Sequence, residues 1–158
     1  MIKGTLFVLL LGTLAHFFYD WSGRNILVGL FAPVSESAWE HMKLVFFPML
    51  LYALAAVPAL KKEYPCIGSA FSAGILLGTL PIPVLFYTYT GILGRDLFPL
   101  DLATFVCSVL LAFCAVYRLT LSCKIQNGTL LRAIVGLFFI GFLLFSYYPP
   151  DIGLFAQP

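Results

Sequence analysis

The chain has 158 residues, of which 61% are hydrophobic and 10% are charged, and its net charge is +2. Its mean hydropathy is +1.01. Soluble domains are usually ~45–50% apolar and ~25% charged, and a soluble domain of this size has too much surface for its volume to bury so much apolar side chain. The composition excludes such a domain, and the small net charge gives no support for a nucleic-acid partner. We therefore expect a single integral membrane domain, residues 1–158, whose partner is the lipid bilayer.

Charged residues divide the sequence into long apolar segments, each expected to be a transmembrane helix. The first is expected at residues 2–20. We expect it to be retained rather than cleaved as a signal peptide, because no convincing small-x-small site follows it. The others are expected at residues 37–60, 64–94, 102–117 and 130–148, followed by a short tail. The predicted fold class is all-α, a polytopic membrane helical bundle of about five transmembrane helices.

Two of these segments, and a short apolar stretch between the first and the second, have features that differ from a simple crossing. Residues 26–33 are apolar but too short to cross, so they predict a re-entrant or interfacial piece, or a link packed against the other spans. Pro48 is expected to kink the second helix. Pro81 and Pro83 should kink or break the third, which is too long for one straight crossing. Small residues such as Gly68 and Gly74 favour close helix packing there, although we see no clean GxxxG spacing.

The distribution of basic residues predicts the orientation. With five crossings, six of the nine lysines and arginines share the side of the N-terminus, namely Lys3, Lys61, Lys62, Arg118, Lys124 and Arg132. Arg24, Lys43 and Arg95 fall on the other side. The positive-inside rule then places the N-terminus in the cytoplasm and the C-terminus outside a cell (inner) membrane.

The four cysteines are expected to be free thiols. Cys107 and Cys114 lie inside an apolar segment, and Cys66 and Cys123 lie near segment ends. No CxxC pair or Cys/His zinc spacing occurs, and burial of free thiols in apolar surroundings is common.

A dense polar stretch, residues 34–43 (VSESAWEHMK), stands between these apolar runs. Ser35 or Ser37 can cap the second helix, and Ser37 with Glu40 matches the capping-box pattern. Glu36, Glu40 and Lys43 are spaced to form one stripe on that helix. Trp39 suits an interfacial level, and His41 points about 100° away from Glu40.

The first span brings two more ionisable residues to the same membrane level. His16 and Asp20 are four residues apart and therefore share one helical face. Most acidic residues also fall on this outer side, where they would attract cations. The predicted pocket lies at the outer ends of spans one, two, three and five. Its expected residues are His16, Asp20, Glu36, Trp39, Glu40 and His41.

Three interpretations of this cluster remain open. In the first, the acidic residues only stabilise a helix N-terminus, Lys43 pairs with Glu40, and His16 bonds Asp20. In the second, His16, Asp20, Glu36 and Glu40 bind a divalent cation such as zinc or manganese. In the third, a buried carboxylate serves acid/base catalysis in a membrane enzyme, although the sequence contains no HExxH or GxSxG motif.

Two segments resemble a known family. The run from Ala32 to Pro48, with Ser35-Glu36-Ser37-Ala38-Trp39-Glu40-His41-Met42-Lys43-Leu44 at its centre, is similar to the signature of a family of small prokaryotic multi-pass membrane proteins classed as a domain of unknown function. The tail from Tyr148 to Phe155 resembles that family's ending. The family pattern has Asn where this chain has Ser35, which weakens any ligand or capping role there. The resemblance implies a shared architecture and no activity.

The sequence thus predicts a membrane protein that binds a cation or small ligand in an outward-facing pocket, in the manner of a transporter. Broken helices such as the third span tend to line cavities. Two alternatives stay open: a membrane-embedded metal-dependent or acid/base enzyme, and a non-catalytic accessory membrane subunit. The only cofactor that the residues suggest is a divalent cation.

Overall fold

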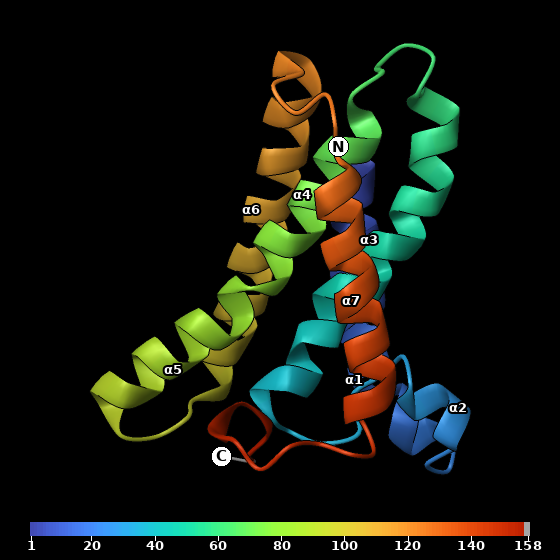
Figure 1. Cartoon of the computed structure of the whole chain (residues 1–158). Coiled ribbons are helices and arrows are strands. Elements are labelled where there is room, and N and C mark those ends of the chain that lie inside the picture. Colours follow the sequence, from blue (N-terminus) through green and yellow to red (C-terminus); the bar gives the residue numbers. More distant parts are fainter. Residues whose placement is uncertain (157–158) are drawn as a thin grey trace.

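The computed structural model of the chain describes residues 1–156, which are almost entirely helical (Figure 1). In chain order the elements are α1 (Ile2–Trp21), α2 (Ile26–Gly29), α3 (Ala38–Leu60), α4 (Ile67–Thr79), α5 (Pro81–Leu93), α6 (Phe98–Ser122), α7 (Thr129–Phe145) and the 3-10 turn η1 (Gly153–Phe155). The described residues contain no strand. The predicted all-α class is confirmed.

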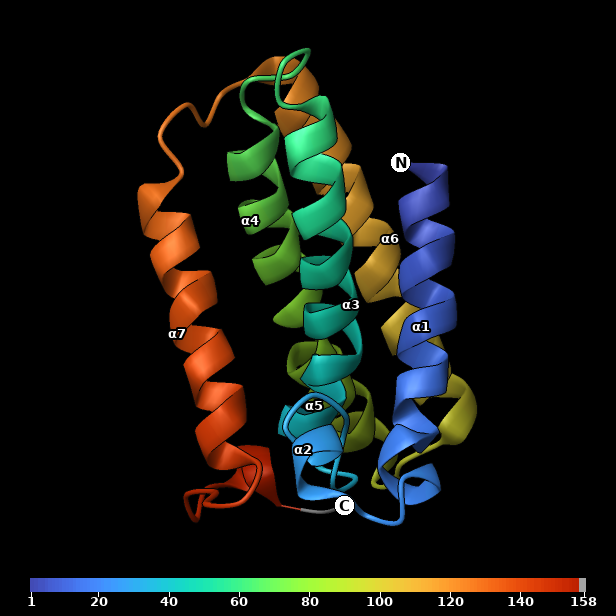
Figure 2. The same ribbon diagram turned by 90° about the vertical axis from the view of Figure 1, so that its right-hand side faces the viewer.

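Four stretches are long and apolar enough to cross a membrane, namely Ile2–Trp21, Ala38–Leu60, Ile67–Leu93 and Phe98–Ser122, and α7 is a shorter apolar helix. This confirms a bundle of about five helices. The N-terminus and the C-terminal tail lie at opposite ends of it (Figure 2). Large apolar side chains point outward, including Leu10, Leu54 and Leu137, which are 67%, 66% and 68% exposed. Such an outer surface matches lipid tails, and these features are those of an integral membrane protein.

The third span is broken between α4 and α5, as predicted. Leu80 ends one helix, and Pro81 stands at the start of the next. Proline has no N–H to donate to the preceding turn, so the chain can change direction here, and α5 leads away from α7 (Figure 1). In contrast, α3 runs from Ala38 to Leu60 through Pro48 and Pro58 without interruption.

Residues 26–33 form a short connection between α1 and α3 that contains the single turn of α2. Asn25 starts the single turn of α2 by accepting a hydrogen bond from the Leu27 N–H at 2.9 Å. The turn lies at the end of the bundle that carries the C-terminal tail (Figure 2). The Gly29 carbonyl accepts a hydrogen bond from Lys43 Nζ at 2.9 Å. The link thereby brings main-chain oxygens to a charged side chain of α3.

Helices α4 and α6 pack along each other through two glycines. A Cβ added at Gly74 would lie 2.3 Å from Val116 Cγ2, and one at Gly78 would lie 2.7 Å from Ala112 Cβ. These glycines are four residues apart, which is the GxxxG spacing of closely packed transmembrane helices. The expectation that no clean GxxxG spacing occurs in this span is therefore wrong.

The prediction of four free cysteines is also wrong. Cys66 and Cys123 form a disulfide with their Cα atoms 5.4 Å apart, and they are separated by 57 positions in the sequence. Cys107 and Cys114 are free, and both are exposed on the surface of α6 rather than buried. Cys66 directly precedes α4 and Cys123 directly follows α6. The bond therefore joins the two closely packed helices at the end opposite the C-terminal tail.

Candidate metal and ligand site

The polar stretch of residues 34–43 spans the loop before α3 and the first turns of that helix. Ser37 is the N-cap, and its Oγ accepts a hydrogen bond from the Glu40 N–H at 3.4 Å. The reciprocal half of the predicted capping box does not form, because Glu40 Oε2 accepts from the Val34 N–H at 2.9 Å. Glu36 precedes the helix, so it does not share the predicted stripe with Glu40 and Lys43.

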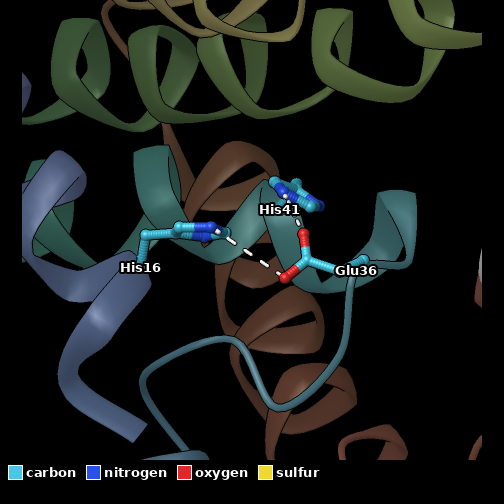
Figure 3. Close-up of side chains that lie close together, drawn as sticks. All are labelled: His16, Glu36 and His41. Carbon is cyan, nitrogen blue, oxygen red and sulfur yellow. Dashed lines mark ion pairs between the residues drawn. The ribbon is translucent and has the colours of Figure 1, made fainter. Parts of the chain in front are cut away.

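Three of the predicted site residues meet at this end of the bundle. His16 from α1, Glu36 from the loop and His41 from α3 each offer one ligand atom, and these atoms lie within 4.8 Å of one another. Glu36 Oε1 is 3.9 Å from His16 Nε2, and Glu36 Oε2 is 3.4 Å from His41 Nε2. Figure 3 shows the carboxylate facing both rings. Ligand atoms about 2 Å from a tetrahedral ion lie about 3.3 Å apart, so small side-chain movements would bring all three onto one ion.

The hydrogen bond of His41 leaves its other nitrogen available. Its Nδ1 lies 3.0 Å from the Ser37 carbonyl oxygen. Since a carbonyl can only accept, this contact assigns the proton to Nδ1 and directs Nε2 toward Glu36. Metal-binding histidines usually donate their second N–H to a carbonyl or carboxylate in this way. The arrangement therefore prepares His41 as a ligand through Nε2.

Asp20 lies beside this group and has its own partner. Its Oδ1 accepts from Arg24 Nε at 3.4 Å, and both side chains are largely exposed. Asp20 and His16 line an open cavity of about 350 Å³ together with Glu36. The structure thus places Asp20 near the three-residue group but does not join it to that group, and His16 does not bond Asp20.

Glu40 and Lys43 form a separate, buried ion pair, as the helix-capping interpretation predicted. Glu40 is 2% exposed and Lys43 is 1% exposed, with Nζ 2.7 Å from Glu40 Oε2. Lys43 also donates to the carbonyls of Gly29 and Ala32 and to Ser146 Oγ. The pair therefore ties the α2 link, α3 and the residue after α7 together, and Glu40 is not available to an ion between the histidines.

A tyrosine reinforces this connection. Tyr147 follows α7, and its hydroxyl donates to the Ile26 carbonyl at 3.0 Å. Burial raises the pKa of Tyr147, so its hydroxyl keeps its proton and remains a donor. The start of the α2 link and the end of α7 are thus joined by a bond that does not involve Lys43.

Trp39 lies in an aromatic cluster rather than in a cavity wall. It is 8% exposed, and its ring centroid lies 4.6 Å from that of Phe142 on α7 and 5.0 Å from that of Phe155 in η1. It lies in the first turn of α3, near the end of the bundle. Its contacts hold the C-terminal tail against α3 and α7.

Glu36 and His41 also line a second cavity. It has a volume of about 140 Å³ and lies between α3, α5 and α6. Asp96 and Asp101 line it, and neither was predicted to be a site residue. In this cavity the fourth span, α6, supplies one wall through Asp101, Thr104 and Phe105. The acidic bias of this end of the molecule was visible in the sequence, but the convergence of the helices was not.

Comparison with known proteins gives the family and no activity. No curated protein and no solved structure matches the chain. A family described as a "Family of unknown function (DUF6512)" matches residues 1–158. Because the match covers the whole chain, this membrane protein belongs to the DUF6512 family.

Proposed function

We propose that this integral membrane protein binds a divalent transition-metal cation between His16, Glu36 and His41. The observation that carries the proposal is the meeting of two imidazole nitrogens and one carboxylate from three separate segments. Two histidines and one carboxylate suit zinc and similar ions. The proposed ligand set includes His41 instead of Glu40, which the sequence suggested, and it does not include Asp20.

Cobalt binding tests this proposal directly. Purified protein in detergent should bind one Co²⁺ and show the visible absorption bands of a low-coordinate cobalt centre. His16→Ala, Glu36→Gln and His41→Ala should each weaken binding by about 100-fold or more, since even residues that only orient metal ligands contribute 10–100-fold.

Asp20→Asn is the matched control for this experiment, because Asp20 lies in the neighbouring cavity but pairs with Arg24. It should retain Co²⁺ binding within a few-fold of the wild type. Unchanged cobalt spectra and affinity in His41→Ala and Glu36→Gln would remove the proposal.

A metal-dependent membrane enzyme is the second candidate. One observation favours it: Glu36 and His41 also line the 140 Å³ cavity. Three protein ligands leave one tetrahedral position for water or substrate, as in catalytic zinc sites. Hydrolytic or acid/base activity that appears with added Zn²⁺ and disappears in Glu36→Gln would select this candidate over transport or storage of the ion.

We further propose that the metal-binding end faces outward from the cytoplasm, with the N-terminus inside. The excess of lysine and arginine at the N-terminal end supports this orientation. The Cys66–Cys123 disulfide lies at that same end, and disulfides are usual in oxidising compartments, so it favours the reverse orientation. A reporter fused after the C-terminus should be active only outside the cytoplasm. A cytoplasmic C-terminus would refute the proposed orientation and place the disulfide in the oxidising compartment.

A further inference from the structure

The cavity between α3, α5 and α6 is lined by acidic and apolar residues. Three acidic residues line it, Glu36, Asp96 and Asp101, and no lysine or arginine of the described residues does so. Even a divalent ion held by Glu36 would leave this wall with one uncompensated negative charge. The cavity therefore favours a positively charged occupant whether or not the proposed metal is bound.

The carboxylate of Asp101 is held in place. Asp101 lies in the first turn of α6, and the Tyr89 hydroxyl donates to its Oδ1. Tyr89 belongs to α5, so the bond connects the two helices that face α3 across the cavity. A fixed carboxylate is a better partner for a ligand cation than a mobile one, because less side-chain freedom is lost on binding.

Thr104 provides a buried polar group that faces the same space. It lines the cavity and is only 8% exposed. Thr88 and Thr90 on α5 donate to the carbonyls of Val84 and Phe86, whereas the Thr104 hydroxyl makes no hydrogen bond to any of residues 1–156. The Thr104 hydroxyl therefore keeps its hydrogen-bonding capacity for an occupant of the cavity, to which it can donate or from which it can accept.

The rest of the wall is apolar and partly aromatic. Leu44, Ile82, Phe86 and Phe105 line the cavity between the polar groups. Apolar side chains contribute nothing to binding a bare metal ion, but they suit the hydrocarbon part of an organic ligand. The faces of Phe rings also attract cations. The wall therefore matches a molecule with one charged and one apolar end.

From these features we propose that the cavity is a binding site for a small organic ammonium compound. The ammonium group lies between Asp96 and Asp101 and donates its N–H groups to their carboxylates, and the Thr104 hydroxyl can accept one of these N–H groups. The apolar part lies against Leu44, Phe86 and Phe105. The site shares Glu36 and His41 with the proposed metal centre but does not include His16, so either can exist without the other.

Calorimetric titration of metal-free protein with benzylammonium tests this proposal, with benzyl alcohol as the uncharged analogue and benzoate as the anionic one. We expect saturable binding of benzylammonium, binding of benzyl alcohol at least about tenfold weaker, and no binding of benzoate. The Asp96→Asn/Asp101→Asn double variant should lose about tenfold or more in affinity. Because this variant lacks the proposed site, the heat that remains in its titration gives the uptake of the probe by the detergent.

His16→Ala separates this site from the metal centre. That variant should lose cobalt binding and keep benzylammonium binding within a few-fold. Asp151→Asn, an exposed carboxylate in the tail, should change neither. The proposal is overturned if millimolar benzylammonium shows no saturable binding, if benzyl alcohol binds equally well, if the double variant binds like the wild type, or if His16→Ala abolishes ammonium binding.

Discussion

Replacing Lys43 with methionine is expected to destabilise the protein by about 3–5 kcal/mol, as measured for buried ion pairs that lose one partner. Lys43 is 1% exposed, and its ammonium group is bound to Glu40, two main-chain carbonyls and Ser146. Methionine fills a similar volume but leaves the Glu40 carboxylate buried without its cation. The loss should appear as easier unfolding when purified protein is titrated with SDS and followed by circular dichroism.

A second substitution distinguishes the lost charge from lost packing. In Glu40→Gln/Lys43→Met no buried charge remains, so the double variant should regain more than half of the lost stability. Lys62→Met, which changes an exposed lysine in the turn after α3, should have little effect. A Lys43→Met protein that unfolds like the wild type would show that the buried pair does not support the fold.

Loss of the Cys66–Cys123 disulfide is expected to destabilise the protein by about 2–4 kcal/mol, because the bond closes a long loop in the unfolded chain. The two cysteines are 57 positions apart. Cys66→Ser or a reducing agent should therefore make unfolding in SDS easier. Reduction should have no further effect on the Cys66→Ser variant.

The free cysteines of α6 provide the control. Cys107→Ser and Cys114→Ser alter exposed thiols and should leave stability nearly unchanged. Maleimide labelling of unfolded, unreduced protein, read by mass spectrometry, should add two labels to the wild type. Labelling of all four cysteines would contradict the disulfide.

The spans could be predicted because each depends on local sequence. An apolar run bounded by charges has few alternatives to a membrane helix, and Pro81 and Pro83 lack the N–H groups with which the preceding helix would continue. The N-cap at Ser37 could be predicted for the same reason, because its capping hydrogen bond reaches only three residues along the chain. The Gly74–Gly78 spacing was equally local and could have been recognised from the sequence.

The site could be predicted only in part, because its geometry depends on separate helices. The spacing of Glu36 and Glu40 suggested a shared helical face, but Ser37 starts the helix after Glu36. Glu36 is thus free to face the histidines, while Glu40 turns inward to Lys43. Asp96 and Asp101 line the same cavity as His41 only because α5 and α6 meet α3 at that end. The pairing of Cys66 with Cys123 could not be predicted for the same reason, because the packing of separate helices brings them together and no sequence spacing relates them.

The partners of Lys43 also determine how the chain can be assembled during synthesis. Glu40 and the carbonyls of Gly29 and Ala32 all precede Lys43 in the chain, so they have left the ribosome before the lysine does. Ser146 follows 103 positions later. The charge of α3 can therefore be neutralised as soon as the first two spans enter the bilayer, where an unpaired lysine would oppose insertion. Helix α7 then docks last, onto a charge that is already paired.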